Sequence, residues 1–154
     1  MQTQLGNRTD PERVLINVKN ISGATMTTGF GVCLAAGNED VAASADGVGA
    51  VLFTASAELR PAFIGVSKAD LANNAYGPII AWGAASVALS QEANVTCDIT
   101  SGLSLLQAGA QAGTFTSGLA LESISTYMGK YVVNMATTST NGAINYTLGL
   151  VRCL

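Results

Sequence analysis

The chain carries few of the side chains that do acid–base or metal chemistry. It has no histidine, which excludes Ser-His-Asp and Cys-His catalytic arrangements and zinc sites built on histidine. Its densest acidic group, Glu39, Asp40 and Asp46, falls in Gly37–Gly49, a small-residue segment typical of a surface loop. The spacing of the acidic residues does not predict that any two carboxylates lie close enough for general acid–base catalysis. We therefore predict no catalytic and no metal-binding residue, although weak cation binding by this loop stays open because only the EF-hand pattern is absent.

The cysteines and glycines also favour structure over chemistry. Cys33, Cys97 and Cys153 are far apart and lie among apolar or small neighbours, as small buried side chains do. The G-x-G stretches GFGVCLAAG and GVGAVLF lack the third glycine, the helix start and the downstream acid of a dinucleotide site. We predict no cofactor and no enzymatic activity.

The stretch ADLANNAYGPIIAWGAASVAL holds a tyrosine and the only tryptophan, which could enclose a ligand. Its glycines and proline favour a structural hairpin instead, with Tyr76 and Trp82 covering the end of a barrel. The predicted parts, in order, are a helical turn at Ala69–Asn73, a break at Tyr76, Gly77 and Pro78, a strand at Ile79–Trp82, a tight turn at Gly83–Ala85 and a strand at Ser86–Leu89.

The elements that would position these residues are mostly short strands. VLINVK alternates, with Val14, Ile16 and Val18 on one face, which is the period of a strand. Asn141-Gly142 separates two further strand-like runs and is a strong hairpin signal. Short strands with closely spaced turns predict an all-β fold, a small β-rich barrel or sandwich. The other strand candidates are FGVCLAA, AVLFTAS, AFIGVS, YVVNMATTS and AINYTLGLVRC.

Helical content is predicted to be small, one or two short turns. The first lies within Ser67–Asn73, where Ser67 could cap and Asp70 would favour the positive end, and the second lies around Leu119–Tyr127. Residues 1–13 crowd charges around Pro11 without apolar periodicity, so they are predicted to form an extended N-terminal arm before a single β-rich domain, residues 14–154.

The composition restricts the partners. Only 11% of the residues are charged, against about a quarter in ordinary soluble domains, so much of the surface is expected to meet a partner. The net charge is −3 and the seven basic residues are scattered, which excludes a nucleic-acid footprint. The long uncharged stretches, Ile99–Leu121 and Tyr131–Val151, are too rich in Gly, Ser, Thr and Asn to enter a membrane. The polar start MQTQLGNRTDPER is not a signal peptide.

Three stretches of the chain share a pattern of small residues and turns: NISGATMTTGFGVCL, FIGVSKADLANNAYGPIIAWGAASVAL and DITSGLSLLQAG. Together they resemble the head decoration (cement) proteins of tailed bacteriophages, and the likeness covers roughly Ile21 to Gly109. It implies a non-enzymatic protein on the outer surface of an icosahedral capsid, assembled in the host cytoplasm. Its partners would be the major capsid protein and further copies of itself, commonly in a trimer. The expected capsid-directed residues lie in the arm: Gln4, Arg8, Asp10, Glu12 and Arg13.

Two other classes of protein fit the same residues. One is a different virion component, such as a head fibre, tail or spike protein, in which a β-rich composition full of Gly, Ala and Thr is also expected. Copy number separates it from a decoration protein. The other is a small cellular β-barrel binding module, which would need a concave apolar pocket with a few convergent polar groups.

Overall fold

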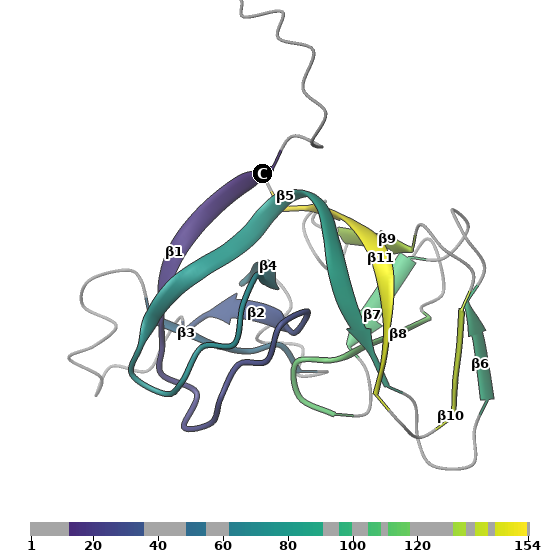
Figure 1. Cartoon of the computed structure of the whole chain (residues 1–154), viewed down its shortest axis with the longest axis horizontal. Coiled ribbons are helices and arrows are strands. Elements are labelled where there is room, and N and C mark those ends of the chain that lie inside the picture. The colour runs from purple at the N-terminus through teal and green to yellow at the C-terminus, as the bar shows by residue number, and fades with distance from the viewer. Residues whose placement is uncertain are drawn as a thin grey trace, which may run out of the picture.

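The structure, a computed structural model, describes residues 13–35, 49–54, 62–90, 96–99, 105–108, 111–117, 131–134, 138–141 and 144–153. Within these residues the protein is all-β, with eleven strands and no helix (Figure 1). The strands are β1 (Val14–Asn20), β2 (Gly31–Leu34), β3 (Gly49–Leu52), β4 (Phe63–Ser67), β5 (Tyr76–Leu89), β6 (Thr96–Ile99), β7 (Leu105–Ala108), β8 (Phe115–Ser117), β9 (Tyr131–Asn134), β10 (Thr138–Asn141) and β11 (Asn145–Arg152).

Five of the strands close into a barrel. Their hydrogen-bonded order is β1–β3–β2–β4–β5, and β1 pairs back onto the first half of β5, from Val14 opposite Trp82 to Lys19 opposite Tyr76. Each strand sends an apolar side chain into one buried cluster, so the barrel interior is packed with side chains. These five side chains are Val18, Val32, Ala50, Ile64 and Ile79.

One end of the barrel is closed by two side chains from its turns. Met26 and Leu71 form an isolated bridge and are both buried. A Cβ at Gly77 would lie 2.7 Å from a methyl group of Leu71, so the glycine makes room for this closure. Buried Asn20 secures the turn beside it, because its Nδ2 donates to the carbonyl oxygens of Leu71 (2.8 Å) and Ala24 (2.7 Å).

The second half of β5 begins another part of the sheet. It pairs with β11, which leads through β9 and β7 to β8, and β8 returns to β5 at the pair Leu89 and Phe115. Strands β6 and β10 form a separate two-stranded sheet (Figure 1). The single strand β5 therefore belongs to both parts of the molecule.

A second apolar core packs outside the barrel and joins the two parts. Three of its rings come from different elements: Phe53 follows β3, Phe63 begins β4 and Phe115 begins β8. Their centroids lie 5.1, 5.4 and 6.0 Å apart, within the range of favourable aromatic contacts. Val87 and Leu89 of β5 are buried in the same cluster.

The prediction of an all-β, barrel-forming chain is confirmed. Strands β2, β4, β9 and β11 fall within predicted strand segments, and β1 and β3 each extend one residue beyond theirs. Cys33 and Cys153 are buried, as expected. The side chain of Cys97 is not among those described. Residues 1–12 of the predicted arm, the loop up to residue 48 and the candidate helix at 119–127 lie outside the described residues.

The predicted hairpin at Gly83–Ala85 is wrong, because β5 runs without interruption from Tyr76 to Leu89. Gly83 has a φ of +108°, which a glycine adopts readily. The conformational freedom of Gly83, which suggested a turn, instead permits a bend inside the strand, visible at the top of Figure 1. At this bend β5 changes neighbours, because Trp82 pairs with Val14 of β1 and also with Arg152 of β11.

The predicted helical turn at Ser67–Asn73 is also wrong. Ser67 ends β4, and its hydroxyl donates to the carbonyl oxygen of Ala69 (2.7 Å) instead of capping a helix. The Asp70 carboxylate accepts hydrogen bonds from the backbone N–H (2.8 Å) and the hydroxyl (2.9 Å) of Thr28. The Ser67 hydroxyl therefore stabilises the turn locally, whereas the Asp70 carboxylate fixes the turn to a distant segment.

The Asp70 contact predicts a pH dependence of stability. The hydrogen bonds from the backbone and then the side chain of Thr28 hold the pKa of Asp70 below its ordinary value of 3.8. A lowered pKa stabilises the folded protein above the ordinary value, and this contribution disappears as the pH falls through the lowered one. The urea midpoint of the wild type should therefore fall more than that of Asp70→Asn between neutral pH and about pH 2. Equal losses would contradict the contact.

The Asn141-Gly142 signal does not produce a tight hairpin between the last two strand segments. Strand β10 pairs with β6, with Asn141 opposite Thr96, while β9 pairs with β11. The two predicted strands do become antiparallel neighbours, from Asn134 opposite Gly149 to Tyr131 opposite Arg152. Their connection is longer than predicted because β10 lies within it.

Candidate functional site

The outward side of β11 is apolar where a solvated strand would be polar. Burial alternates along the strand, and the outward positions from Tyr146 onward carry large side chains. Tyr146 is 49% exposed, Leu148 46% and Leu150 38%. A single exposed leucine is common, but three large apolar residues in one row mark a contact surface.

The neighbouring half of β5 extends this surface. Antiparallel pairing places Ser86 beside Leu148 and Ala84 beside Leu150, so these side chains lie on the same side of the sheet. At the end of the row the Arg152 guanidinium lies 5.7 Å from the centre of the Trp82 ring, a cation–π distance. The term β5–β11 face is used below for these outward residues: Trp82, Ala84, Ser86, Tyr146, Leu148, Leu150 and Arg152.

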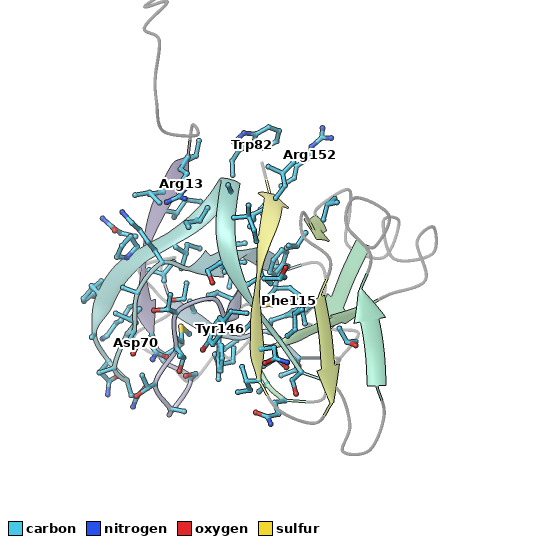
Figure 2. All side chains as sticks on the ribbon, turned by 45° about the vertical axis from the view of Figure 1, so that its right-hand side comes forward. Arg13, Asp70, Trp82, Phe115, Tyr146 and Arg152 are labelled. Atoms are coloured by element: carbon cyan, nitrogen blue, oxygen red, sulfur yellow. The ribbon has the colours of Figure 1, made fainter. Side chains whose placement is uncertain are left out.

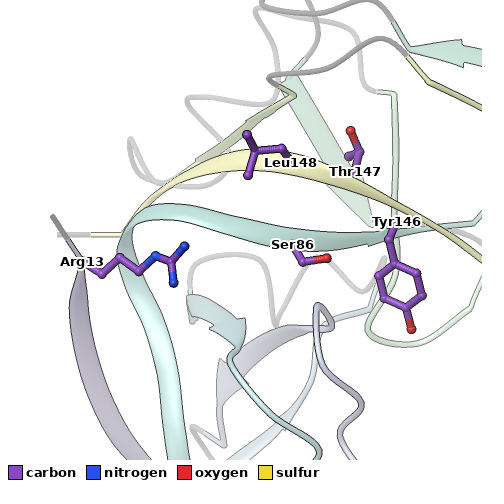
Figure 3. A pocket seen from close by; sticks show the side chains of 5 residues that line it. All are labelled: Arg13, Ser86, Tyr146, Thr147 and Leu148. Carbon is purple, nitrogen blue, oxygen red and sulfur yellow. The ribbon is translucent and has the colours of Figure 1, made fainter. Parts of the chain in front are cut away.

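The start of β1 borders the face. Figure 2 shows Arg13, Trp82 and Arg152 at the same end of the molecule, where β1 begins and β5 bends. An open pocket of about 380 Å³ lies on the face and is lined by five residues (Figure 3). In Figure 3 the Arg13 side chain extends toward Ser86. The lining residues are Arg13, Ser86, Tyr146, Thr147 and Leu148.

This arrangement can hold an apolar side chain and bind a carboxylate or a carbonyl oxygen at its rim. The Arg13 guanidinium is a planar donor with several N–H groups, and the hydroxyls of Ser86 and Tyr146 can donate or accept. None of the described residues that line the pocket carries an imidazole or a carboxylate. Among the described residues no group of three His, Cys, Asp or Glu side chains could hold a metal ion.

The predicted site residues do not form one site. Of the arm residues, Arg13 borders the β5–β11 face, and Gln4, Arg8, Asp10 and Glu12 lie outside the described residues.

The five residues of the predicted hairpin are all in β5, but they lie at two places along it. Trp82 and Gly83 are at the bend, while Tyr76, Gly77 and Pro78 begin the strand. Tyr76 does not cover the barrel end, since its side chain is 61% exposed and the Lys19 ammonium lies 5.7 Å from the ring centre. Trp82 is 37% exposed and belongs to the face.

Sequence reasoning missed the apolar row on β11. One phase of the stretch NYTLGLVR carries the large residues Tyr146, Leu148 and Leu150, and the other carries smaller ones, so hydrophobicity alone would point the larger residues inward. The inward phase includes Gly149, where a Cβ would lie 2.6 Å from a methyl group of Val87 and 3.1 Å from one of Val132. These valines occupy the space that a side chain would need, so the larger residues are outward.

Comparison with known proteins adds no identification. The chain matches no protein-family model, and it matches no curated protein. The described residues contain no helix that is long and apolar enough to cross a membrane.

Proposed function

We propose that the chain is a structural, non-enzymatic virion protein that binds the outer surface of an icosahedral phage capsid and stabilises contacts between capsomers. The observation that carries the proposal is the row Tyr146, Leu148 and Leu150 on the β5–β11 face. A monomer gains nothing from exposing this row, whereas a protein that covers a shell buries it. The major capsid protein is the partner, and copies of the chain associate with one another, in a trimer by the resemblance.

One further feature supports the proposal. The stretch from Ile21 to Gly109 resembles decoration proteins, and the row Tyr146, Leu148 and Leu150 lies outside that stretch. By mass action, a protein that binds only the assembled shell stabilises the shell in proportion to the occupied sites.

Another virion component, such as a head fibre, tail or spike protein, would use the same face and differs in copy number. A cellular β-barrel binding module is disfavoured by the barrel itself. Buried side chains such as Val32, Met26 and Leu71 fill its interior, and the pocket at Arg13 lies outside it.

Deletion of residues 1–13 tests the arm. We expect the shortened protein to keep the thermal unfolding midpoint of the full chain, because β1 and its pairing begin at Val14. It should no longer sediment with capsids assembled from the major capsid protein of the same genome, since charge-assisted contacts of Arg8, Glu12 and Arg13 are lost. The control replaces residues 1–13 by a Gly/Ser segment of equal length. Unchanged occupancy of the deleted protein on capsids would remove the arm from the capsid contact.

A further inference from the structure

Among the described strands, none pairs with the outer edge of β1 along its first half, and this edge is called free below. Pairing with β5 runs from Val14 to Lys19, but β3 pairs with β1 only at Lys19 and Asn20. No other described strand pairs with Leu15 or Asn17. An unpaired strand edge is a template for an added strand.

The hydrogen bonds show which backbone groups this edge presents. Asn20 faces β5, since its N–H donates to Ala75 O (2.9 Å) and its carbonyl oxygen accepts from Asn74 N–H (2.7 Å). Backbone groups alternate along a strand, so the N–H and C=O groups of Leu15 and Asn17 point away from β5. The residue of β5 opposite Asn17 is Pro78, which has no backbone N–H and so cannot donate a hydrogen bond to Asn17.

The side chains around this edge favour a strand as the covering element. Val14, Leu15 and Ile16 are 39%, 44% and 36% exposed, and consecutive residues of a strand point to opposite faces. A flat surface would cover only one of these faces. A strand added along the edge covers both, and it takes up the free N–H and C=O groups as well.

Space and charge both argue against a second copy of β1 as that strand. The antiparallel register that uses both outward residues pairs Leu15 of one copy with Asn17 of the other. It would place Arg13 of one copy opposite Lys19 of the other, a position that Gly49 of β3 already occupies on this edge. The two cations would also repel one another. The edge is apolar in the middle and cationic at both ends.

We infer that the free edge of β1, residues 14–17, binds an extended segment of a partner protein by strand addition, and that this segment is apolar in the middle and acidic at its ends. The inference rests on the proposed function only in naming the capsid protein as the source of the segment. The recognition itself follows from the edge, its two exposed faces and its flanking cations.

Two synthetic peptides test the recognition without capsids. Both alternate valine and threonine, one with an aspartate at each end and the other with a lysine at each end. The acidic peptide should slow amide hydrogen exchange of Leu15 and Asn17 and bind at least about tenfold more tightly than the basic one. Ile16 and Val18, whose amides face β5, should exchange slowly with or without peptide. Equal binding of the two peptides, or unchanged exchange at Leu15 and Asn17, would overturn the inference.

Proline variants separate the edge from the barrel. Asn17→Pro removes only an outward N–H, so the thermal midpoint should stay close to that of Asn17→Ala while peptide binding is lost. Ile16→Pro removes a hydrogen bond to β5 and should unfold the barrel. The charge-reversed variant Arg13→Glu with Lys19→Glu needs no proline and should prefer the basic peptide. If this variant still binds the acidic peptide more tightly than the basic one, the inference is overturned.

The same variants on capsids distinguish the two proposals. If the full chain sediments with capsids and Asn17→Pro does so equally well, the inference fails and the proposed function stands. If the full chain does not bind capsids, the proposed function fails, and the peptide result alone decides the inference. If Asn17→Pro changes the oligomeric mass of the protein, the edge binds a second copy of the chain. That result would overturn the inference that it binds an acidic segment of another protein.

Discussion

Leu148→Asp is expected to weaken capsid binding at least about 30-fold, the loss typical of a residue at the centre of an interface. The side chain lies mid-row on the β5–β11 face, next to Ser86, and lines the pocket beside Arg13. A carboxylate there would lose its hydration on contact without gaining a partner from the apolar row. The free energy of unfolding should change by no more than about 0.5 kcal/mol, because the side chain is half exposed already.

The matched control is Leu34→Asp. Leu34 is also an exposed leucine, 37% accessible, but it ends β2, outside the face. It makes the same chemical change to the surface and should leave capsid binding within about twofold of the wild type. Sedimentation with capsids over a range of protein concentrations measures both variants. Equal binding by the two would show that the face does not carry the contact.

Gly65→Ala is expected to give the largest loss of stability in the barrel, at least about 3 kcal/mol from overpacking and the positive φ together. Gly65 has a φ of +149° in the middle of β4, where the chain crosses β5. A Cβ at this position would overlap the carbonyl oxygen of Ile80, and backbone cannot move aside as a flexible side chain can. Closure of the barrel therefore depends on this glycine.

Gly23→Ala provides the comparison. Gly23 also has a positive φ, +81°, but nothing lies within 4 Å of the position of an added Cβ. It should lose only about 1 kcal/mol, the conformational cost alone. Urea denaturation followed by tryptophan fluorescence gives both values. Similar losses in the two variants would mean that the close approach of β4 to β5 contributes little.

Local sequence was sufficient for the first barrel strands. The alternation at Val14–Lys19 predicts β1, and the run FGVCLAA predicts β2, which the turn at Thr28-Gly29 precedes, with a φ of +85° at Gly29. Here the turn chemistry and the alternation both come from neighbouring residues, so the sequence contains the whole signal.

Local sequence was insufficient for β5 and for the face. Gly83 permits either a turn or a bend, and the choice depends on Val14 and Arg152, both distant in sequence, which pair with Trp82. In the same way, Val132 and Val87 decide which phase of β11 faces inward. Asp70 would favour a helix by itself, but its hydrogen bonds to Thr28 fix it in a turn. In each case a tertiary contact decides between two locally acceptable structures.

The central claim is that the chain covers a capsid, and its copy number on the particle tests this most directly. Quantitative mass spectrometry of purified particles gives the ratio of this chain to the major capsid protein. Our account predicts that the copy number of the chain approaches that of the major capsid protein. A few copies per particle, as expected for a fibre, tail or spike protein, or absence from the particle, would contradict it.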